Sequence, residues 1–352
     1  MTPWTVKDLQ KYSRIFLGAG CLLSLPLAIH HGDQLFRSYL LAYLTWVGIP
    51  IGGLGILLLY LLVGGEWGRS SHRILKTLAR TIPWTALLFV PILIGLGRIY
   101  PWMHITNWTG VSAAHKRLYF RPPFFIARTA IYFALWSWLA LRFEKRTAAL
   151  GLVIYVFTVS FASFDWMMSL EPQWGSTIYG GMIMVGDVLS GFAFTVALMC
   201  GLREQVTPYV PDGETAVDLG NLLLAFVMLW TYMALSQYLI IWSANLPEEI
   251  GWYLARQRGG WQGVALLLIG LQFVLPFFLL LARKNKQRLA SLGKVALLLL
   301  TVRLIDVFWL VVPDFHPAHF SFHFLDVTVM AALGGIWLDM FFRQLEKVPN
   351  HV

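Results

Sequence analysis

The stretch STIYGGMIMVGDVLSGFAFTVALMCG, residues 176–201, carries a single charged side chain, Asp187, in an otherwise apolar run. An α-helix needs roughly 20 predominantly apolar residues to cross the hydrocarbon core of a bilayer. Because lipid offers the backbone no hydrogen-bond partners, such a segment is expected to cross as a helix. The stretch therefore predicts a membrane-spanning helix with a carboxyl group near its middle.

The whole chain has the same character. Of its 352 residues, 58% are hydrophobic and only 13% are charged, and the mean hydropathy is +0.65. A soluble domain carries about 25% charged residues. Cys21 and Cys200 both lie in apolar runs, so they cannot supply a CxxC metal or iron–sulfur site. The composition predicts an all-α polytopic membrane protein with a single integral membrane domain, residues 1–352.

Ten segments are long and apolar enough to cross a membrane, and we expect all of them to be helices. They lie at about residues 12–30, 36–64, 79–99, 122–142, 147–168, 176–201, 219–243, 259–282, 291–313 and 323–344. The formal net charge is +9. If both termini are cytoplasmic, most of the 27 lysines and arginines lie on the cytoplasmic side, as the positive-inside rule requires.

Asp187 would lie close to the bilayer midplane, where an ionised carboxylate costs several kcal/mol unless it is paired, hydrated or protonated. Gly180, Gly181, Gly186 and Gly191 flank it and would allow close helix packing. A carboxyl group in this position can take up and release protons. The alternative is an aspartate that only bonds a neighbouring helix.

Two arginines also fall within predicted spans. Arg303 and Asp306 in the ninth span are three residues apart, so they can form a pair on one helix face. Arg128, one turn before Tyr132 in the fourth span, needs an anionic partner, for which Asp165, Asp187 and Asp306 are candidates.

The fifth span ends in a polar stripe. Tyr155, Thr158 and Asp165 share one helix face, and Glu171 follows on the short outer connection. This stripe predicts a proton path leading outward, with Tyr155 and Thr158 as its inner half. A helix-terminal aspartate that only meets water or an arginine is the alternative.

The outer loop PDFHPAHFSFHFLD, residues 313–326, gathers histidines and carboxylates: Asp314, His316, His319, His323 and Asp326. Its HxxHxxxH spacing is not a firm zinc signature, and we expect no metal site there. Proton exchange, partner contact or simple solvation remain open for it. No histidine lies in the middle of a span, so haem bound by this chain is not expected.

Two stretches carry a family resemblance. SFASFDWMMSLEPQWGSTIYGG (160–181) and MLWTYMALSQYLIIWSANLPEEIGWYLAR (228–256) resemble the ActF family of integral membrane subunits of bacterial alternative complex III, which belongs to the wider NrfD-like group. One position departs from the expected pattern: Gln173 stands where we expect a histidine.

The resemblance implies two four-helix bundles, helices 2–5 at about residues 36–168 and helices 6–9 at about 176–313, flanked by the first and last helices. It implies a bacterial cytoplasmic (inner) membrane and a respiratory or photosynthetic complex that oxidises quinol or menaquinol. Iron–sulfur clusters and haem c would be bound by partner subunits and no cofactor by this chain. The implied partners are the NrfD-like paralogue ActC, the iron–sulfur subunit ActB, the c-type cytochrome subunits ActA and ActE, and ActD. The implied role is proton translocation, without catalysis by this chain.

Three functions therefore remain open. In the first, the chain conducts protons through its carboxylates, and Arg303 and Arg128 tune Asp187. In the second, it binds quinol itself, with Asp165, Trp166, His316 and Asp326 as the candidate site. In the third, it is an independent secondary transporter. A plain structural anchor, whose charges only hold helices together, is the remaining alternative.

Overall fold

The computed structural model describes residues 5–108, 113–142 and 144–349, and within these ranges every regular element is a helix. Ten helical segments are long and apolar enough to cross a membrane. The ten predicted spans are therefore confirmed, and the chain is an all-helical, multi-pass membrane protein.

The ten spans are formed by α1 (Val6–His30), α2 (Gly32–Val63), α3 (Glu66–Leu88) continued by α4 (Val90–Ile94), α7 (Pro122–Arg142), α8 (Ala148–Trp166), α9 (Tyr179–Leu202), α10 (Gly213–Ala244), α12 (Trp261–Leu268) continued by η5 (Ile269–Val274) and α13 (Leu275–Leu281), α15 (Leu289–Phe315) and α16 (Phe324–Lys347). The shorter elements are α5 (Leu96–Ile99), η1 (Pro101–Met103), α6 (Ala113–Tyr119), η2 (Lys145–Thr147), η3 (Met168–Leu170), η4 (Arg203–Gln205), α11 (Pro247–Arg256) and α14 (Arg283–Gln287).

The third span begins at Glu66, well before the residue 79 expected from hydropathy. Its first turns are amphipathic. Arg69, Arg73, Lys76 and Arg80 recur at helical spacing on one face, while the other face is buried. A hydropathy window averages the two faces and so misses a helix of this kind.

Capping side chains fix two other early helix starts. The Thr5 hydroxyl accepts a hydrogen bond from the Asp8 backbone amide at 3.2 Å and starts α1. The Asp212 carboxylate accepts one from the Thr215 amide at 2.8 Å and starts α10. Such caps satisfy amides that the first turn of a helix leaves free. Both helices therefore begin several residues before their apolar runs.

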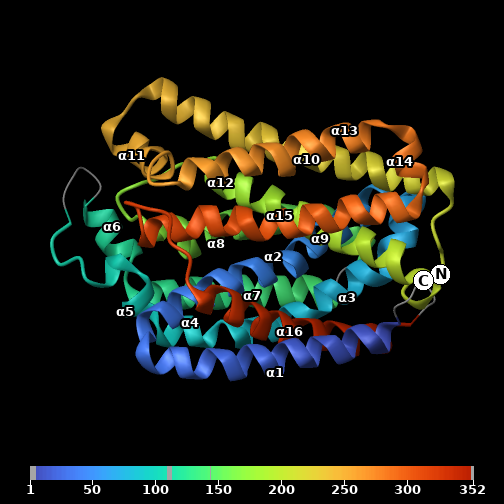
Figure 1. The fold of residues 1–352 in the computed structure, drawn as a ribbon, viewed down its shortest axis with the longest axis horizontal. Helices are drawn as coiled ribbons and strands as arrows, with labels where there is room; N and C mark the ends of the chain where they lie inside the picture. The colour runs from blue at the N-terminus through green and yellow to red at the C-terminus, as the bar shows by residue number, and fades with distance from the viewer. Residues whose placement is uncertain (1–4, 109–112, 143, 350–352) are drawn as a thin grey trace.

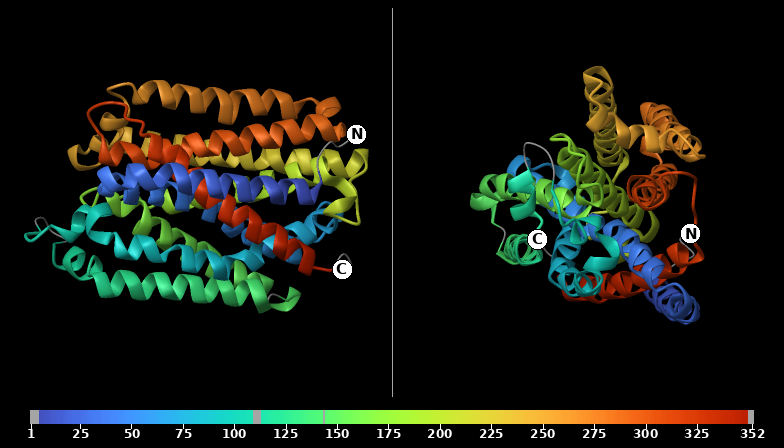
Figure 2. Two further views of the ribbon diagram at one scale, coloured as in Figure 1. Left: turned by 60° about the horizontal axis from the view of Figure 1, so that its bottom comes forward. Right: turned by 90° about the vertical axis from the view of Figure 1, so that its left-hand side faces the viewer.

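The spans run roughly parallel to one long axis, and the start of α1 and the end of α16 lie at the same end of the molecule (Figure 1). We call the opposite end, which carries α6 and α11, the far end. α2 and α9 are the most buried spans and pack against each other along much of their length. α1 lies at one edge of the bundle against α16, and α10, α12 and α13 lie at another edge (Figure 2).

Two local features were not apparent from hydropathy. The eighth span contains a π-helical turn, η5, just before Pro276, and extra residues of this kind often occur where a proline removes a backbone donor. The far-end connection between α10 and α12 contains the short amphipathic helix α11, which buries Trp252 and Arg256. The second feature places one further charged side chain, Arg256, inside the fold, and it is described below.

Candidate functional site

The most deeply placed charges form a group of three, which we call the triad: Asp187 on α9, and Arg303 and Asp306 on α15. Arg303 Nη2 donates to Asp187 Oδ1 at 3.0 Å, and Arg303 Nη1 donates to Asp306 Oδ2. All three side chains are buried. The predicted pairing of Arg303 with Asp306 is confirmed, and Asp187 joins the same guanidinium.

Glycines make room for the triad. A Cβ atom on Gly186 would lie 2.4 Å from Arg303 Nη1, and one on Gly48 would lie 2.5 Å from Asp187 Oδ1. At Gly52 the Cβ would lie 1.8 Å from the Asp187 carbonyl oxygen, so α2 and α9 touch backbone to backbone there. Small residues allow such close approach between membrane helices. The helix contact and the charged site therefore depend on the same glycines.

The triad is unbalanced in charge. It combines two carboxyl groups with one guanidinium, and no other charged side chain in the described part of the chain acts appreciably on any of its three members. With both carboxyl groups ionised, the group carries one net negative charge in a low-dielectric interior, which costs several kcal/mol. It becomes neutral when one carboxyl group holds a proton. This composition suits a group that stores one exchangeable proton.

A small internal cavity adjoins the triad. It has a volume of about 20 Å³, and Asp187 and Arg303 line one side of it while Trp136, Ser163 and Trp166 line another. A cavity of roughly 10–15 Å³ by this measure holds a water molecule where polar partners are present. The space can therefore hold a single water between the triad and the side chains around Trp166.

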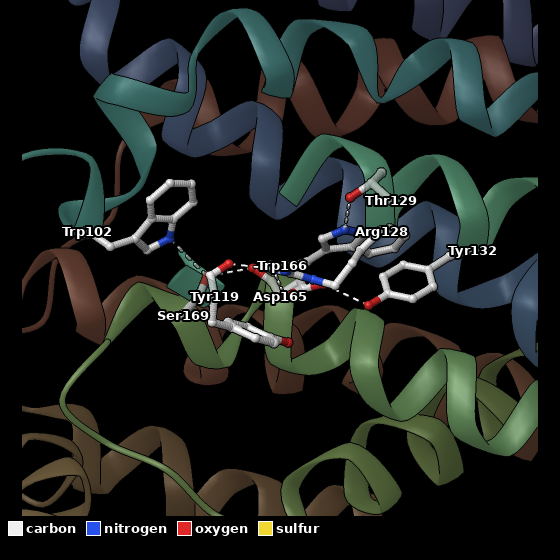
Figure 3. Close-up of polar contacts among 8 residues, drawn as sticks. All are labelled: Trp102, Tyr119, Arg128, Thr129, Tyr132, Asp165, Trp166 and Ser169. Atoms are coloured by element: carbon white, nitrogen blue, oxygen red, sulfur yellow. Dashed lines mark hydrogen bonds and ion pairs between the residues drawn. The ribbon is translucent and has the colours of Figure 1, made fainter. Parts of the chain in front are cut away.

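The second charged group is the pair of Arg128 and Asp165 (Figure 3). Arg128 donates twice, from Nε to Oδ2 at 2.9 Å and from Nη2 to Oδ1 at 2.8 Å, and the Tyr132 hydroxyl donates to Oδ2 at 2.8 Å. Asp165 is completely buried. The Tyr119 ring covers the guanidinium at 3.8 Å. Among the three candidates for Arg128, the structure selects Asp165, and this pair is balanced at one charge each.

Trp166 lies in the interior rather than on the far-end surface. Its indole nitrogen donates to the Thr129 hydroxyl at 3.2 Å (Figure 3). Its ring contacts those of Phe89 and Phe133. The side chain is buried. Trp166 is thus part of the wall between the Arg128–Asp165 pair and the cavity, and it is not grouped with His316 and Asp326.

Tyr155 and Thr158 point in different directions although they share a helix face. The Tyr155 hydroxyl is buried against Gly55 of α2, has no hydrogen-bond partner among the described residues, and lies close enough to Asp187 to sense its charge. The Thr158 hydroxyl accepts from the Trp136 indole at 2.8 Å and donates to the Ile154 carbonyl at 2.6 Å. Only Tyr155 adjoins the triad.

A third charged group, Arg256 with Asp314, was not predicted from the sequence. Arg256 Nη2 donates to Asp314 Oδ1 at 2.7 Å and to the Leu310 carbonyl at 2.7 Å, and its side chain is 1% exposed. The Trp252 ring lies 3.5 Å from the guanidinium carbon. A signal existed: residues 303, 306, 310 and 314 recur at spacings of 3, 4 and 4, one face of α15.

Tyr179 and Glu171 connect these groups spatially. Tyr179, at the start of α9, lies within electrostatic range of both the Arg303–Asp306 and the Arg256–Asp314 pairs. Glu171 is exposed at the far end. Partial desolvation of its carboxyl group raises its pKa, the negative charge of Asp314 raises this pKa further, and the positive charge of Arg256 opposes the shift. Polar side chains therefore extend from the triad to the far-end surface.

The histidines of the loop lie at the far end with Asp326, but Asp314, which the sequence grouped with them, pairs with Arg256 instead. His316 and His319 have ring centres 6.4 Å apart, and His323 contacts the His31 ring at 5.1 Å. Asp326 accepts from the Ser38 hydroxyl and from the His323 backbone amide. Burial and the nearby Arg37 charge lower the pKa of His316. This cluster is separate from the three charged groups described above.

At the end that holds the termini, Asp339 bridges two arginines. Arg14 Nε and Arg343 Nε donate to its two oxygens at 2.8 and 2.7 Å. The expected Asp339–Arg343 pair is confirmed, and Arg14 joins it.

No protein-family model matches this sequence, and no curated protein matches it either. The functional assignment of this membrane protein therefore rests on the residues and the geometry described above.

Proposed function

We propose that this chain is a proton-conducting membrane subunit of a quinol-oxidising electron-transfer complex, of the ActF kind found in bacterial alternative complex III. The observation that carries the proposal is the triad: two buried carboxyl groups share one guanidinium beside a cavity of water size. This arrangement gives a relay its central element, a proton held near the middle of the membrane.

The outward half of the relay follows the face of α15. A proton released from the triad passes by the Tyr179 hydroxyl to the Arg256–Asp314 pair and leaves through Glu171. Asp306 and Asp314 are eight residues apart, about 12 Å along the helix, so the transfer needs Tyr179 or water between them. The raised pKa of Glu171 suits a group that accepts a proton before releasing it.

Asp165 takes a different role in this proposal. It is bonded twice by Arg128 and once by Tyr132, and its charge is balanced without a proton. We assign it to holding α7 and α8 together. Of the two outward carboxylates suggested by the sequence, Glu171 is therefore the exit. On the inner side, Tyr155 is the side chain that we assign to proton entry to Asp187.

The same proposal includes the membrane topology and the partners. The end that holds both termini is the cytoplasmic one, because most of the basic residues gather there, and the membrane is a bacterial inner membrane. Spans 2–5 and 6–9 are the two NrfD-like bundles. In this proposal ActB supplies the iron–sulfur clusters, ActA and ActE supply haem c, and ActC and ActD are further partners. Quinol is oxidised beside this chain.

The first test is assembly. The chain is purified gently from its native membrane, and haem c and iron in the preparation are measured. A complex subunit brings both, whereas an independent transporter is isolated alone or as a homo-oligomer.

The second test places the intact complex in liposomes and records quinol:acceptor turnover and internal pH together. Asp187→Asn is compared with wild type and with Asp339→Asn, a matched aspartate that pairs with arginines at the other end of the molecule. We expect turnover to persist and proton movement to fall for Asp187→Asn only. If neither quantity changes, Asp187 is structural and the relay is wrong.

A second candidate function, quinol binding, is favoured by one observation. A groove of about 610 Å³ opens beside Arg128 and is lined by Tyr119, Phe161 and Trp174 among other aromatic residues. A quinol ring could stack on these aromatic side chains next to the Arg128 guanidinium. Loss of turnover in an assembled Asp187→Asn complex, together with quinol protection of this groove, would support this candidate over proton conduction.

A further inference from the structure

A large apolar groove runs along the far half of the bundle, away from the triad. Its volume is about 960 Å³, within the range of small-molecule sites. α16 forms its floor from Asp326 to Leu338, and Leu41 of α2, Gly263 of α12 and Phe308 of α15 contribute walls. Nothing in the proton relay uses this groove.

The length of the groove matches one leaflet of a membrane. From Asp326 to Leu338 the floor covers 12 residues of α16, which is about 18 Å of helix. The hydrocarbon core of a bilayer is about 30 Å thick. A transmembrane helix of a partner subunit would need a surface along the whole core, whereas an acyl chain needs only one leaflet. The dimensions therefore favour a lipid chain.

The far end of the groove is polar and carries an arginine that is not paired with an acid. Asp326 already accepts from Ser38, from Gln34 at 3.3 Å and from the His323 amide at 3.0 Å. Arg37 lies one helical turn outward from Leu41. Among the described residues it forms no ion pair, its buried Nε has no hydrogen-bond partner, and its guanidinium carbon lies 5.0 Å from the Phe315 ring.

Further donors surround this arginine. The Arg37 guanidinium lies against Phe315, the residue before His316, and the His316 and His319 rings are 6.4 Å apart. Asp326 lines the groove and accepts from Ser38, next to Arg37, and from the His323 amide. One cluster at the end of the groove is therefore formed by Arg37, His316, His319, His323 and Asp326. The single carboxylate in it is already hydrogen-bonded, and His323 Nδ1 accepts from the Leu325 amide at 3.1 Å, whereas the buried Arg37 Nε has no hydrogen-bond partner among the described residues. A phosphate group is complementary to this set, because it offers several acceptor oxygens and a negative charge.

We propose that the groove binds an anionic phospholipid, with its phosphate at Arg37 and the histidines of the cluster and an acyl chain along α16. The lipid belongs to the leaflet at the far end. The site does not depend on the proton relay, and either can fail without the other.

The headgroup is tested with Arg37→Gln. The full chain is purified and placed in nanodiscs of equal phosphatidylglycerol and phosphatidylcholine, and bound lipid is measured by native mass spectrometry. We expect wild type to retain phosphatidylglycerol selectively and Arg37→Gln to lower that selectivity about fivefold, the usual effect of one basic residue near anionic lipid. Arg98→Gln is the matched control, since Arg98 lies at the same end but is paired with Asp33.

The binding site for the acyl chain is tested with Gly263→Leu. A Cβ at Gly263 meets no atom within 4 Å, so the new side chain fills the groove without displacing the protein. Gly18→Leu is the control, because Gly18 also faces open space but lies outside the groove. We expect only Gly263→Leu to lose the bound lipid.

Three results would overturn the proposal. These are retention of both lipids in the nanodisc ratio, equal effects of Arg37→Gln and Arg98→Gln, or a quinone in the groove in place of phospholipid. If Arg37→Gln does not fold, the result for Gly263→Leu decides whether the proposal stands, because a side chain at position 263 clashes with no other atom of the protein.

Discussion

The charge count in the buried groups predicts losses of stability of different size for the same substitution, aspartate to asparagine, at two buried positions. Asp165→Asn removes the only carboxylate that pairs with Arg128 among the described residues. Asp187→Asn removes one of two carboxyl groups that share Arg303. The first change leaves an arginine without a counter-charge, whereas the second turns an unbalanced triad into a neutral pair.

The magnitudes follow from this difference. Leaving one partner of a buried ion pair uncompensated costs about 3–5 kcal/mol of unfolding free energy. The Arg128 side chain is 18% exposed, so we expect the lower end, about 3 kcal/mol, for Asp165→Asn. For Asp187→Asn the amide oxygen still accepts from Arg303, and we expect a loss of about 1 kcal/mol, the usual value of one hydrogen bond. The difference of about 2 kcal/mol corresponds to roughly 30-fold in the unfolding equilibrium.

The assay is the free energy of unfolding of the purified chain in mixed micelles, measured by titration with a denaturing detergent at neutral pH. Glu66→Gln serves as a control because Glu66 forms an exposed pair with Arg69, which contributes little. Equal losses for Asp165→Asn and Asp187→Asn would refute the reasoning, since both triad carboxylates would then be ionised and structurally required.

Three further predictions concern packing, the cavity and pH. Gly52→Ala places a Cβ 1.8 Å from the Asp187 carbonyl oxygen, so we expect a loss of about 3 kcal/mol or more and a lower yield of folded protein, whereas Gly18→Ala, in open space, leaves the yield unchanged. Ala162→Leu fills the cavity beside the triad and should slow proton movement in liposomes without loss of assembly. The control is a leucine substitution at an exposed alanine of the same helix. Equal rates of proton movement for the two variants would argue against a water in the cavity. The folded protein raises the pKa of Glu171 above the ordinary value of 4.5. Ionisation of Glu171 therefore lowers the free energy of unfolding as the pH rises from 4.5 through this raised pKa. Glu171→Gln should remove this loss. The free energy of unfolding of both proteins is measured at pH 4 and pH 7, and we expect the difference between the two proteins to be larger at pH 7.

Sequence reasoning reached part of the site. The Arg303–Asp306 pair was predictable because both residues lie on one helix, where a spacing of three fixes their proximity. The need of Arg128 for an acid was also predictable, but the choice of Asp165 was not. The Arg256–Asp314 pair was missed because Arg256 belongs to α11, a short amphipathic helix that hydropathy does not reveal.

The sequence by itself determined that the described part of this chain has ten segments long and apolar enough to cross a membrane, and that these segments are helices. The physical reason is local: bilayer thickness sets the length of each apolar run, and lipid forces every backbone group to bond within its own helix. Which charges meet was decided only by the tertiary structure. Partner choice depends on the depth and rotation of one helix against another, and these are set where α2 and α9 touch at Gly52 and where Gly186 admits Arg303. Hydropathy does not depend on such contacts, because a glycine at a helix crossing and a glycine facing lipid have the same hydropathy value.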